Sequence, residues 1–95
     1  MIRIAGDCAE VSGPMTLSAA TALLAEGEAA IASAATAFDL AAVTDLDSSC
    51  LAVVFGWMRA AKAAGKSLRL MNPPSNLLSL AAVYDVAELL PQHKP

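Results

Sequence analysis

The feature that most limits the fold is a long apolar helix expected between two short strand-like segments. Residues 36–43 are apolar and of strand length, which predicts a strand buried on both faces. The helix is expected to begin at Asp47 or Ser48 and to stop before Gly65, because glycine is a common residue just after a helix end. Residues 67–71 alternate as a strand does. This alternation predicts an α/β layer fold in which the two strands are parallel.

Two strand-like segments and an alanine-rich helix precede this unit. Residues 1–5 and 9–11 predict strands joined by a Gly-Asp turn, and SGPM, residues 12–15, is expected to close the second strand. Thr16 is expected to be the N-cap of a helix that runs to about residue 35.

The end of the chain predicts one more helix. Pro73 and Pro74 break the chain, a helix is expected over residues 75–84, and a short closing turn is expected over residues 86–90. A chain of 95 residues supports one core, so a single domain over residues 1–95 is expected. We therefore expect an α/β fold, a mixed sheet of about four strands with about three helices packed on it. The alternative is an all-helical bundle whose alanines imitate strands.

Composition limits where the protein acts. Hydrophobic residues make up 57% of the chain, yet the longest apolar run, residues 51–64, is interrupted by Arg59 and Lys62 and is shorter than the roughly 20 residues of a membrane span. The N-terminus shows no secretory signal, so we expect a cytoplasmic protein without direct membrane insertion. The high apolar content predicts exposed apolar surface, hence a protein partner, or a homodimer when the chain is alone.

Charge argues against a nucleic-acid partner. The net charge is −3 and the isoelectric point is about 4.8, so the chain lacks the positive field that binding to phosphate backbones needs. Four basic residues do fall close together, namely Arg59, Lys62, Lys66 and Arg69. We expect them to be a solvated helix end.

The reactive side chains argue against catalysis. Cys8 and Cys50 are far apart in sequence and form no C-x-x-C motif, which is unlike a zinc site or a disulfide framework. The one histidine, His93, lies in the tail. With only carboxylates available as a base near Ser48, and no glycine-rich phosphate loop, we expect no enzyme activity, no metal and no cofactor.

A polar triplet, Asp47, Ser48 and Ser49, stands where the central helix begins. Asp and Ser side chains accept hydrogen bonds from the unpaired N–H groups of a helix start, so a simple cap is one interpretation. The other is that Ser48 is phosphorylated or contacts a partner, because the positive helix end favours an anion. Trp57 is a second candidate contact, since a lone Trp at the edge of a core is a common interface anchor; burial within its own domain is the alternative.

From Phe38 to Pro91 the chain resembles the STAS-domain family. The likeness lies in a strand ending in Asp-Leu, a short link to the Asp-Ser-Ser triplet, a helix, a Gly-Lys turn, a strand, and a leucine-rich helix that leads to YDVAELLP. The turn SGPMT resembles the small-residue turn that precedes the first helix of the family. STAS domains serve as anti-anti-sigma factors, as cytoplasmic parts of anion transporters, and as the MlaB-type subunits of phospholipid ABC transporters. The MlaB type is the branch that this chain most resembles.

The resemblance implies roles for individual residues. The phosphorylatable hydroxyl of the family falls on Ser48, between Asp47 and Ser49, and Asp39 matches an acidic residue expected near the same site. An MlaB-like role implies docking on an MlaF-like ATPase subunit, peripheral to the inner membrane, in a transporter that maintains outer-membrane lipid asymmetry. An anti-anti-sigma role implies a switch controlled by phosphorylation of Ser48.

Two positions depart from the family pattern. Cys50 stands where anti-anti-sigma factors often have glycine, and Thr16 replaces an acidic residue after the first turn. Both departures argue against the phosphorylation switch more than against docking, because docking asks mainly for a shaped, partly apolar surface.

Overall fold

The computed structural model describes residues 1–84; the closing turn expected over residues 86–90 and His93 lie outside the described residues. The elements in chain order are β1 (Ile2–Ala5), β2 (Cys8–Met15), α1 (Leu17–Ser33), β3 (Ala37–Leu46), α2 (Ser49–Ala63), β4 (Arg69–Met71) and α3 (Ser75–Val83). The expected α/β fold of four strands and three helices is confirmed, and the all-helical alternative is wrong. Within residues 1–84, no helix is both long and apolar enough to cross a membrane.

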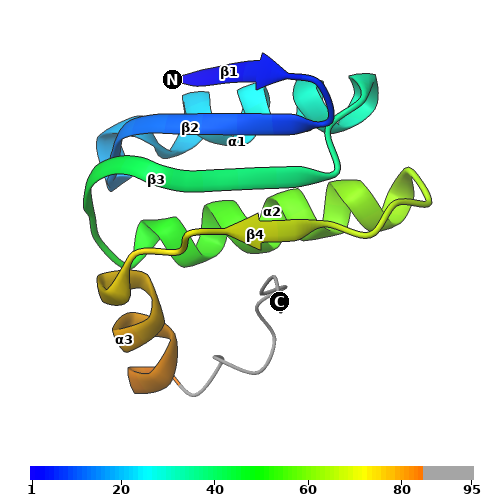
Figure 1. The fold of residues 1–95 in the computed structure, drawn as a ribbon. Coiled ribbons are helices and arrows are strands. Elements are labelled where there is room, and N and C mark those ends of the chain that lie inside the picture. Colours follow the sequence, from blue (N-terminus) through cyan, green and yellow to red (C-terminus); the bar gives the residue numbers. More distant parts are fainter. Residues whose placement is uncertain (85–95) are drawn as a thin grey trace.

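The four strands form one mixed sheet in the order β1-β2-β3-β4 (Figure 1). β1 pairs with β2 in antiparallel fashion, whereas β2 with β3 and β3 with β4 are parallel pairs. The parallel pair expected around the central helix is therefore confirmed. Figure 1 shows α1 and α2 lying along the same face of the sheet, with α3 beyond the start of α2.

β2 is longer than the sequence indicates. Residues 12–15 do not close it, because β2 stays paired with β3 up to the pair Met15–Leu46. Two irregularities in the register, between Glu10 and Ser12 and between Gly13 and Pro14, let the strand continue past the proline, as β-bulges do.

β3 is buried on both faces only in its first part. Residues 37–40 are buried or half-buried, whereas residues 41–46 are exposed or half-exposed. The reason is that β4 pairs only with residues 37–39 of β3, so the remainder of β3 has a strand on one side only. The prediction of a strand buried throughout was therefore wrong for its second half.

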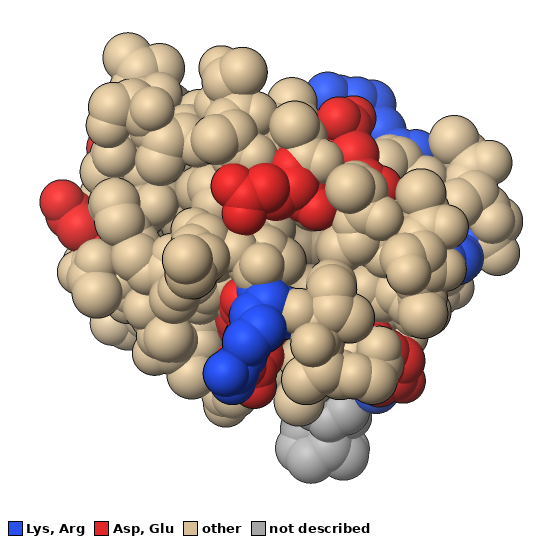
Figure 2. Space-filling view, turned by 90° about the horizontal axis from the view of Figure 1, so that it is seen from above, with Lys and Arg blue, Asp and Glu red and all other residues tan. Residues whose placement is uncertain are grey.

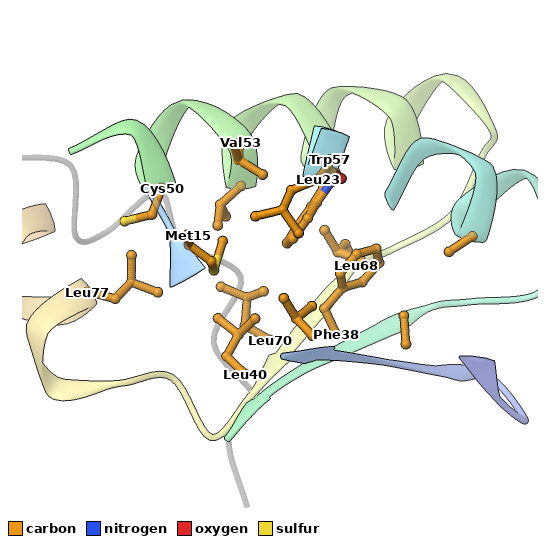
Figure 3. Packing of buried hydrophobic residues seen from close by; sticks show 14 of the residues in the cluster. Met15, Leu23, Phe38, Leu40, Cys50, Val53, Trp57, Leu68, Leu70 and Leu77 are labelled. Carbon is orange, nitrogen blue, oxygen red and sulfur yellow. Dashed lines mark hydrogen bonds between the residues drawn. The ribbon is translucent and has the colours of Figure 1, made fainter. Parts of the chain in front are cut away.

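The core fills the space between the sheet and the two long helices. Phe38, Leu40 and Leu70 from the sheet meet Leu23 of α1 and Trp57 of α2, and each of the five is at most 1% exposed. Figure 3 shows these side chains converging, together with those of Met15, Cys50, Val53, Leu68 and Leu77.

Two glycines let α1 and α2 approach closely. A side-chain carbon at Gly27 would overlap the indole of Trp57, and one at Gly56 would overlap Leu24. Gly27 is unfavourable within an isolated helix, and the contact with Trp57 explains why it stands there. α1 therefore covers much of the wide apolar face of α2.

The far end of α1 is held by Lys66, which follows α2. Its Nζ donates to the backbone oxygens of Ile31 and of Ser33, the second at 3.3 Å. Both oxygens belong to the last turn of α1, where a cation is stabilising. Lys66 is therefore a cap for another helix rather than part of a solvated helix end.

Candidate functional site

The carboxyl ends of β2 and β3 bring the starts of two helices together. The strands are parallel and pair to their last residues, Met15 and Leu46. α1 begins shortly after the first of these and α2 shortly after the second, at one edge of the sheet (Figure 1, left). This is the edge at which α/β folds usually place a binding site. We call the surface formed by Leu17, Asp47, Ser48 and Ser49 the helix-start edge.

Asp47 joins the two helix starts. Its Oδ1 accepts the Ser49 N–H at 2.8 Å, and its Oδ2 accepts the Leu17 N–H at 3.1 Å. Thr16 occupies the N-cap position of α1, but its side chain makes no cap bond and lies 3.3 Å from the Ser18 hydroxyl. The expectation that Thr16 caps α1 is correct for its position and wrong for its side chain, because Asp47 supplies the acceptor.

These two bonds lower the pKa of Asp47 from its ordinary value of 3.8. The bond from the Ser49 N–H has the largest effect, and the bond from the Leu17 N–H is next. Both donors stabilise the charged carboxylate. Folding therefore favours the ionised form of Asp47.

Asp47 should make the fold sensitive to acid. Its pKa is lower in the folded chain, so its stabilising effect is complete at neutral pH and is lost as the pH falls from about 3.8 through the folded value. Urea unfolding should show that Asp47→Asn is less stable than the wild type at neutral pH, and that the difference shrinks at pH values below the folded pKa. Glu28→Gln, at an exposed position of α1, is the matched control and should show no such difference. A deficit of Asp47→Asn that does not change with pH would contradict a role for the charge.

Ser48 keeps its hydroxyl out of this arrangement. It stands at the N-cap position of α2 with a helical backbone, φ −61° and ψ −17°, and its side chain makes no cap bond. The Ser48 residue is exposed, whereas Ser49 is half-buried and its N–H is already bonded to Asp47. The triplet is thus divided: Asp47 is the cap, and Ser48 presents a hydroxyl at the surface.

A shallow groove of about 480 Å³ runs from Ser48 to α3. Tyr84, at the far side, is 56% exposed, and Leu17, beside Asp47, is 74% exposed. Hydroxyl and amide groups thus stand next to apolar side chains, a composition suited to a contact with another protein. The groove is lined by Leu46, Asp47, Ser48, Asn76, Ser79, Leu80 and Tyr84.

The contribution of α3 to this groove was not predicted. A signal for it exists in the sequence, because Asn76 and Ser79 are three residues apart on a leucine-rich helix and so share a face that is not apolar. What the sequence does not contain is the placement of that face opposite Ser48.

Trp57 is not part of the helix-start edge. Its side chain is 0% exposed, its Nε1–H donates to the Leu23 oxygen at 3.1 Å, and its ring centroid lies 4.3 Å from that of Phe38. The prediction that Trp57 is a surface anchor is therefore wrong. Two other large apolar residues of α2, Phe55 and Met58, are half-exposed.

Asp39 is also separate from Ser48. It lies near the beginning of β3, in register with Glu10 and Met71, and eight residues of strand and turn before Asp47 correspond to a separation on the order of 20 Å. Its Oδ1 accepts the Ala41 N–H at 2.9 Å and the Asn72 side-chain amide at 3.1 Å. Asp39 thus fixes the turn after β4, and its expected place near the site is wrong because β3 continues well beyond it.

Cys50 follows the triplet but points into the core. Its residue is 0% exposed, and burial, with the nearby Asp47 carboxylate, raises the pKa of its thiol to about 11. The thiol is therefore protonated at neutral pH, a state in which it is a weak nucleophile.

The acidic and basic side chains are scattered on the face of the molecule that Figure 2 shows. Figure 2, a view from above Figure 1, shows a largely neutral face on which acidic and basic side chains are dispersed. That face offers no extended positive surface of the kind that phosphate backbones attract. Within residues 1–84, no group of three His, Cys, Asp or Glu side chains is arranged to hold a metal ion.

The mixed sheet, the two helices on one face and the exposed serine where β3 gives way to α2 define a small α/β domain of the STAS class. The protein family described as "Mlab, STAS domain" matches residues 2–91. Because this match spans most of the chain, the protein belongs to that STAS family. No curated protein sequence matches the chain.

Solved structures that share the fold include two forms of SpoIIAA. The anti-sigma factor antagonist SpoIIAA in its unphosphorylated form has a TM-score of 0.67 at 20% identity, covering 100% of this chain and 87% of that one. The Bacillus cell fate determinant SpoIIAA in the phosphorylated form has a TM-score of 0.67 at 18% identity, covering 99% of this chain and 90% of that one. At these identities the likeness establishes the fold.

Proposed function

We propose that this chain is a non-catalytic docking subunit of a phospholipid ABC transporter. It binds the cytoplasmic MlaF-like ATPase at the inner membrane, and stabilises or regulates it, in a system that maintains outer-membrane lipid asymmetry. The observation that carries the proposal is the exposed Ser48 hydroxyl beside a partly apolar groove. The family description, which includes the MlaB type, supports this choice of partner.

The geometry of the helix-start edge suits docking. Leu17 of this edge and Tyr84 of the adjoining groove provide apolar area that a partner can bury, and tyrosine is a frequent anchor of protein interfaces. Ser48 provides a hydroxyl, while Asp47 already holds both helix starts in place. An edge that is ordered before binding loses little conformational entropy on association. Nothing in this role requires catalysis, and the neighbouring Cys50 thiol is buried.

Ser48→Arg should break the complex without unfolding the chain. Arginine at this exposed position would place a charge and a long side chain against the apolar part of the contact, so we expect an affinity loss of at least about tenfold. The measurement is the dissociation constant with the purified ATPase, together with the melting temperature of the isolated variant. Ser67→Arg, at an exposed serine between α2 and β4, is the matched control and should bind like the wild type. If folded Ser48→Arg binds the ATPase with unchanged affinity, the proposal that Ser48 belongs to the docking site is wrong.

The identity of the partner has its own test. Affinity purification of the full chain from native cells should recover an ABC-type ATPase, and deletion of this chain should lower the cellular level of that ATPase. Recovery of an anti-sigma kinase in place of an ATPase would overturn the proposed partner but keep the helix-start edge as the site.

A phosphorylation-controlled regulator is the second candidate. It is favoured by the exposed Ser48 hydroxyl at a helix start and by the fold shared with SpoIIAA, solved in both phosphorylation states. A phosphate would add roughly −1.5 to −2 charge beside Asp47. It would repel an acidic partner surface, and it would be costly to desolvate against an apolar one. Intact mass after incubation with cellular kinases, with Ser48→Ala as control, decides it: a chain that never gains phosphate at Ser48 is no such switch.

A further inference from the structure

A second groove lies on the flank of α2, away from the helix-start edge. Its volume is about 500 Å³, within the roughly 300–1,000 Å³ of typical small-molecule sites, which are mostly apolar with a few well-placed polar groups. Phe55 and Met58 are half-exposed there, and Leu68 is 8% exposed. The groove is lined by Phe55, Met58, Arg59, Ala61, Lys62, Lys66 and Leu68.

Two cations of this groove lack a counter-charge among the described residues. Within residues 1–84, the one ion pair joins Arg3 to Glu10. The Lys66 ammonium group already donates hydrogen bonds to backbone oxygens in the last turn of α1. Arg59 and Lys62 are both exposed and stand three residues apart on α2, which places them on the same side of the helix.

We propose that this groove binds an anionic amphiphile, a molecule with an apolar body and one carboxylate or phosphate head. The body would lie on Phe55, Met58 and Leu68, and the head would meet Arg59 and Lys62. The apolar residues alone would bind a neutral apolar ligand, and the two cations alone would bind a free anion. Only an anionic amphiphile contacts both the apolar residues and the cations. A groove of about 500 Å³ has room for a single small molecule. The proposal does not depend on the docking function, because the two grooves share no residue.

Four probes built on ten-carbon chains test the proposal on the full chain: decanoate, decyl phosphate, decanol and decyltrimethylammonium, the three charged probes below their micelle concentrations and decanol below its solubility limit. Calorimetric titration should show binding of at least one anionic probe, with decanol at least about tenfold weaker and no binding of the cationic probe. The ratio between decanoate and decyl phosphate identifies the preferred head. Backbone NMR shifts should change mainly over residues 55–68.

Variants locate the site. Arg59→Gln combined with Lys62→Gln should weaken the anionic probes at least about tenfold and leave decanol unchanged, because hydrogen bonds to ionised groups are the strong ones. Arg69→Gln, a neighbouring basic residue outside the groove, is the matched control and should bind like the wild type, and circular dichroism should show all variants folded. No binding of either anion, equal binding of decanol, shifts confined to other regions, or an equal effect of Arg69→Gln would each overturn the proposal.

Discussion

Trp57→Ala should cost about 3–5 kcal/mol of folding free energy, out of the roughly 5–15 kcal/mol typical of a natural domain. The Trp57 side chain is completely buried, so its removal leaves a cavity between α1, α2 and the sheet. The substitution also removes the ring contact with Phe38 and the bond to the Leu23 oxygen. Urea unfolding followed by circular dichroism measures the loss.

Trp57→Phe separates packing from binding. Phenylalanine keeps much of the buried area and loses the N–H donor, so the expected cost is only about 1–2 kcal/mol. Because Trp57 is buried away from the helix-start edge, folded Trp57→Phe should bind the proposed ATPase partner with wild-type affinity. A folded Trp57→Phe that has lost its partner would restore Trp57 to the interface.

Gly27→Ala should destabilise the chain, although alanine favours helices. The gain in helix propensity is about 1 kcal/mol, whereas overpacking a core typically costs about 1–3 kcal/mol and occasionally more. The new methyl group would overlap the indole of Trp57, which cannot move without losing its bond to Leu23. With the overpacking cost near its upper end, about 3 kcal/mol, and the propensity gain of about 1 kcal/mol, we expect a net loss of about 2 kcal/mol, measured by urea unfolding.

Gly56→Ala is the matched control, with the same substitution in the facing helix. There the new methyl group would meet the terminal carbon of Leu24, a half-buried side chain that can change rotamer. Its cost should be clearly smaller than that of Gly27→Ala. Equal stability of the two variants, or a Gly27→Ala variant more stable than the wild type, would contradict the proposed contact between Gly27 and Trp57.

The architecture could be predicted from local patterns because each element carries its own signal. The apolar run of β3, the long helix before Gly65 and the alternating β4 give the βαβ unit without knowledge of any distant contact. The lengths of β2 and β3 could not be predicted, because they depend on pairing between the two strands. Pro14 is a strand-breaking residue by its own chemistry, and only the irregular register with β3 keeps it within β2.

The candidate site was predictable only in part, for the same reason. The exposed Ser48 follows from a local helix-start signal, whereas the bond between Asp47 and Leu17 joins residues 30 positions apart. The burial of Trp57 depends on Gly27 in another helix. The expectation that Asp39 lies near the site was wrong because the length of β3 was not predicted. Contacts between distant segments decide these three outcomes, and periodicity along one segment contains no information about them.

The division of labour between Asp47 and Ser48 has a consequence for how such a domain can change. One side chain joins the two helix starts and its immediate neighbour is exposed, so we expect different kinds of selection on the two adjacent codons. In a saturation library, substitutions at Asp47 should be depleted whether or not the partner is present, while depletion at Ser48 should appear only with the partner. The edge could then acquire a new binding preference through residue 48 without endangering the scaffold that displays it.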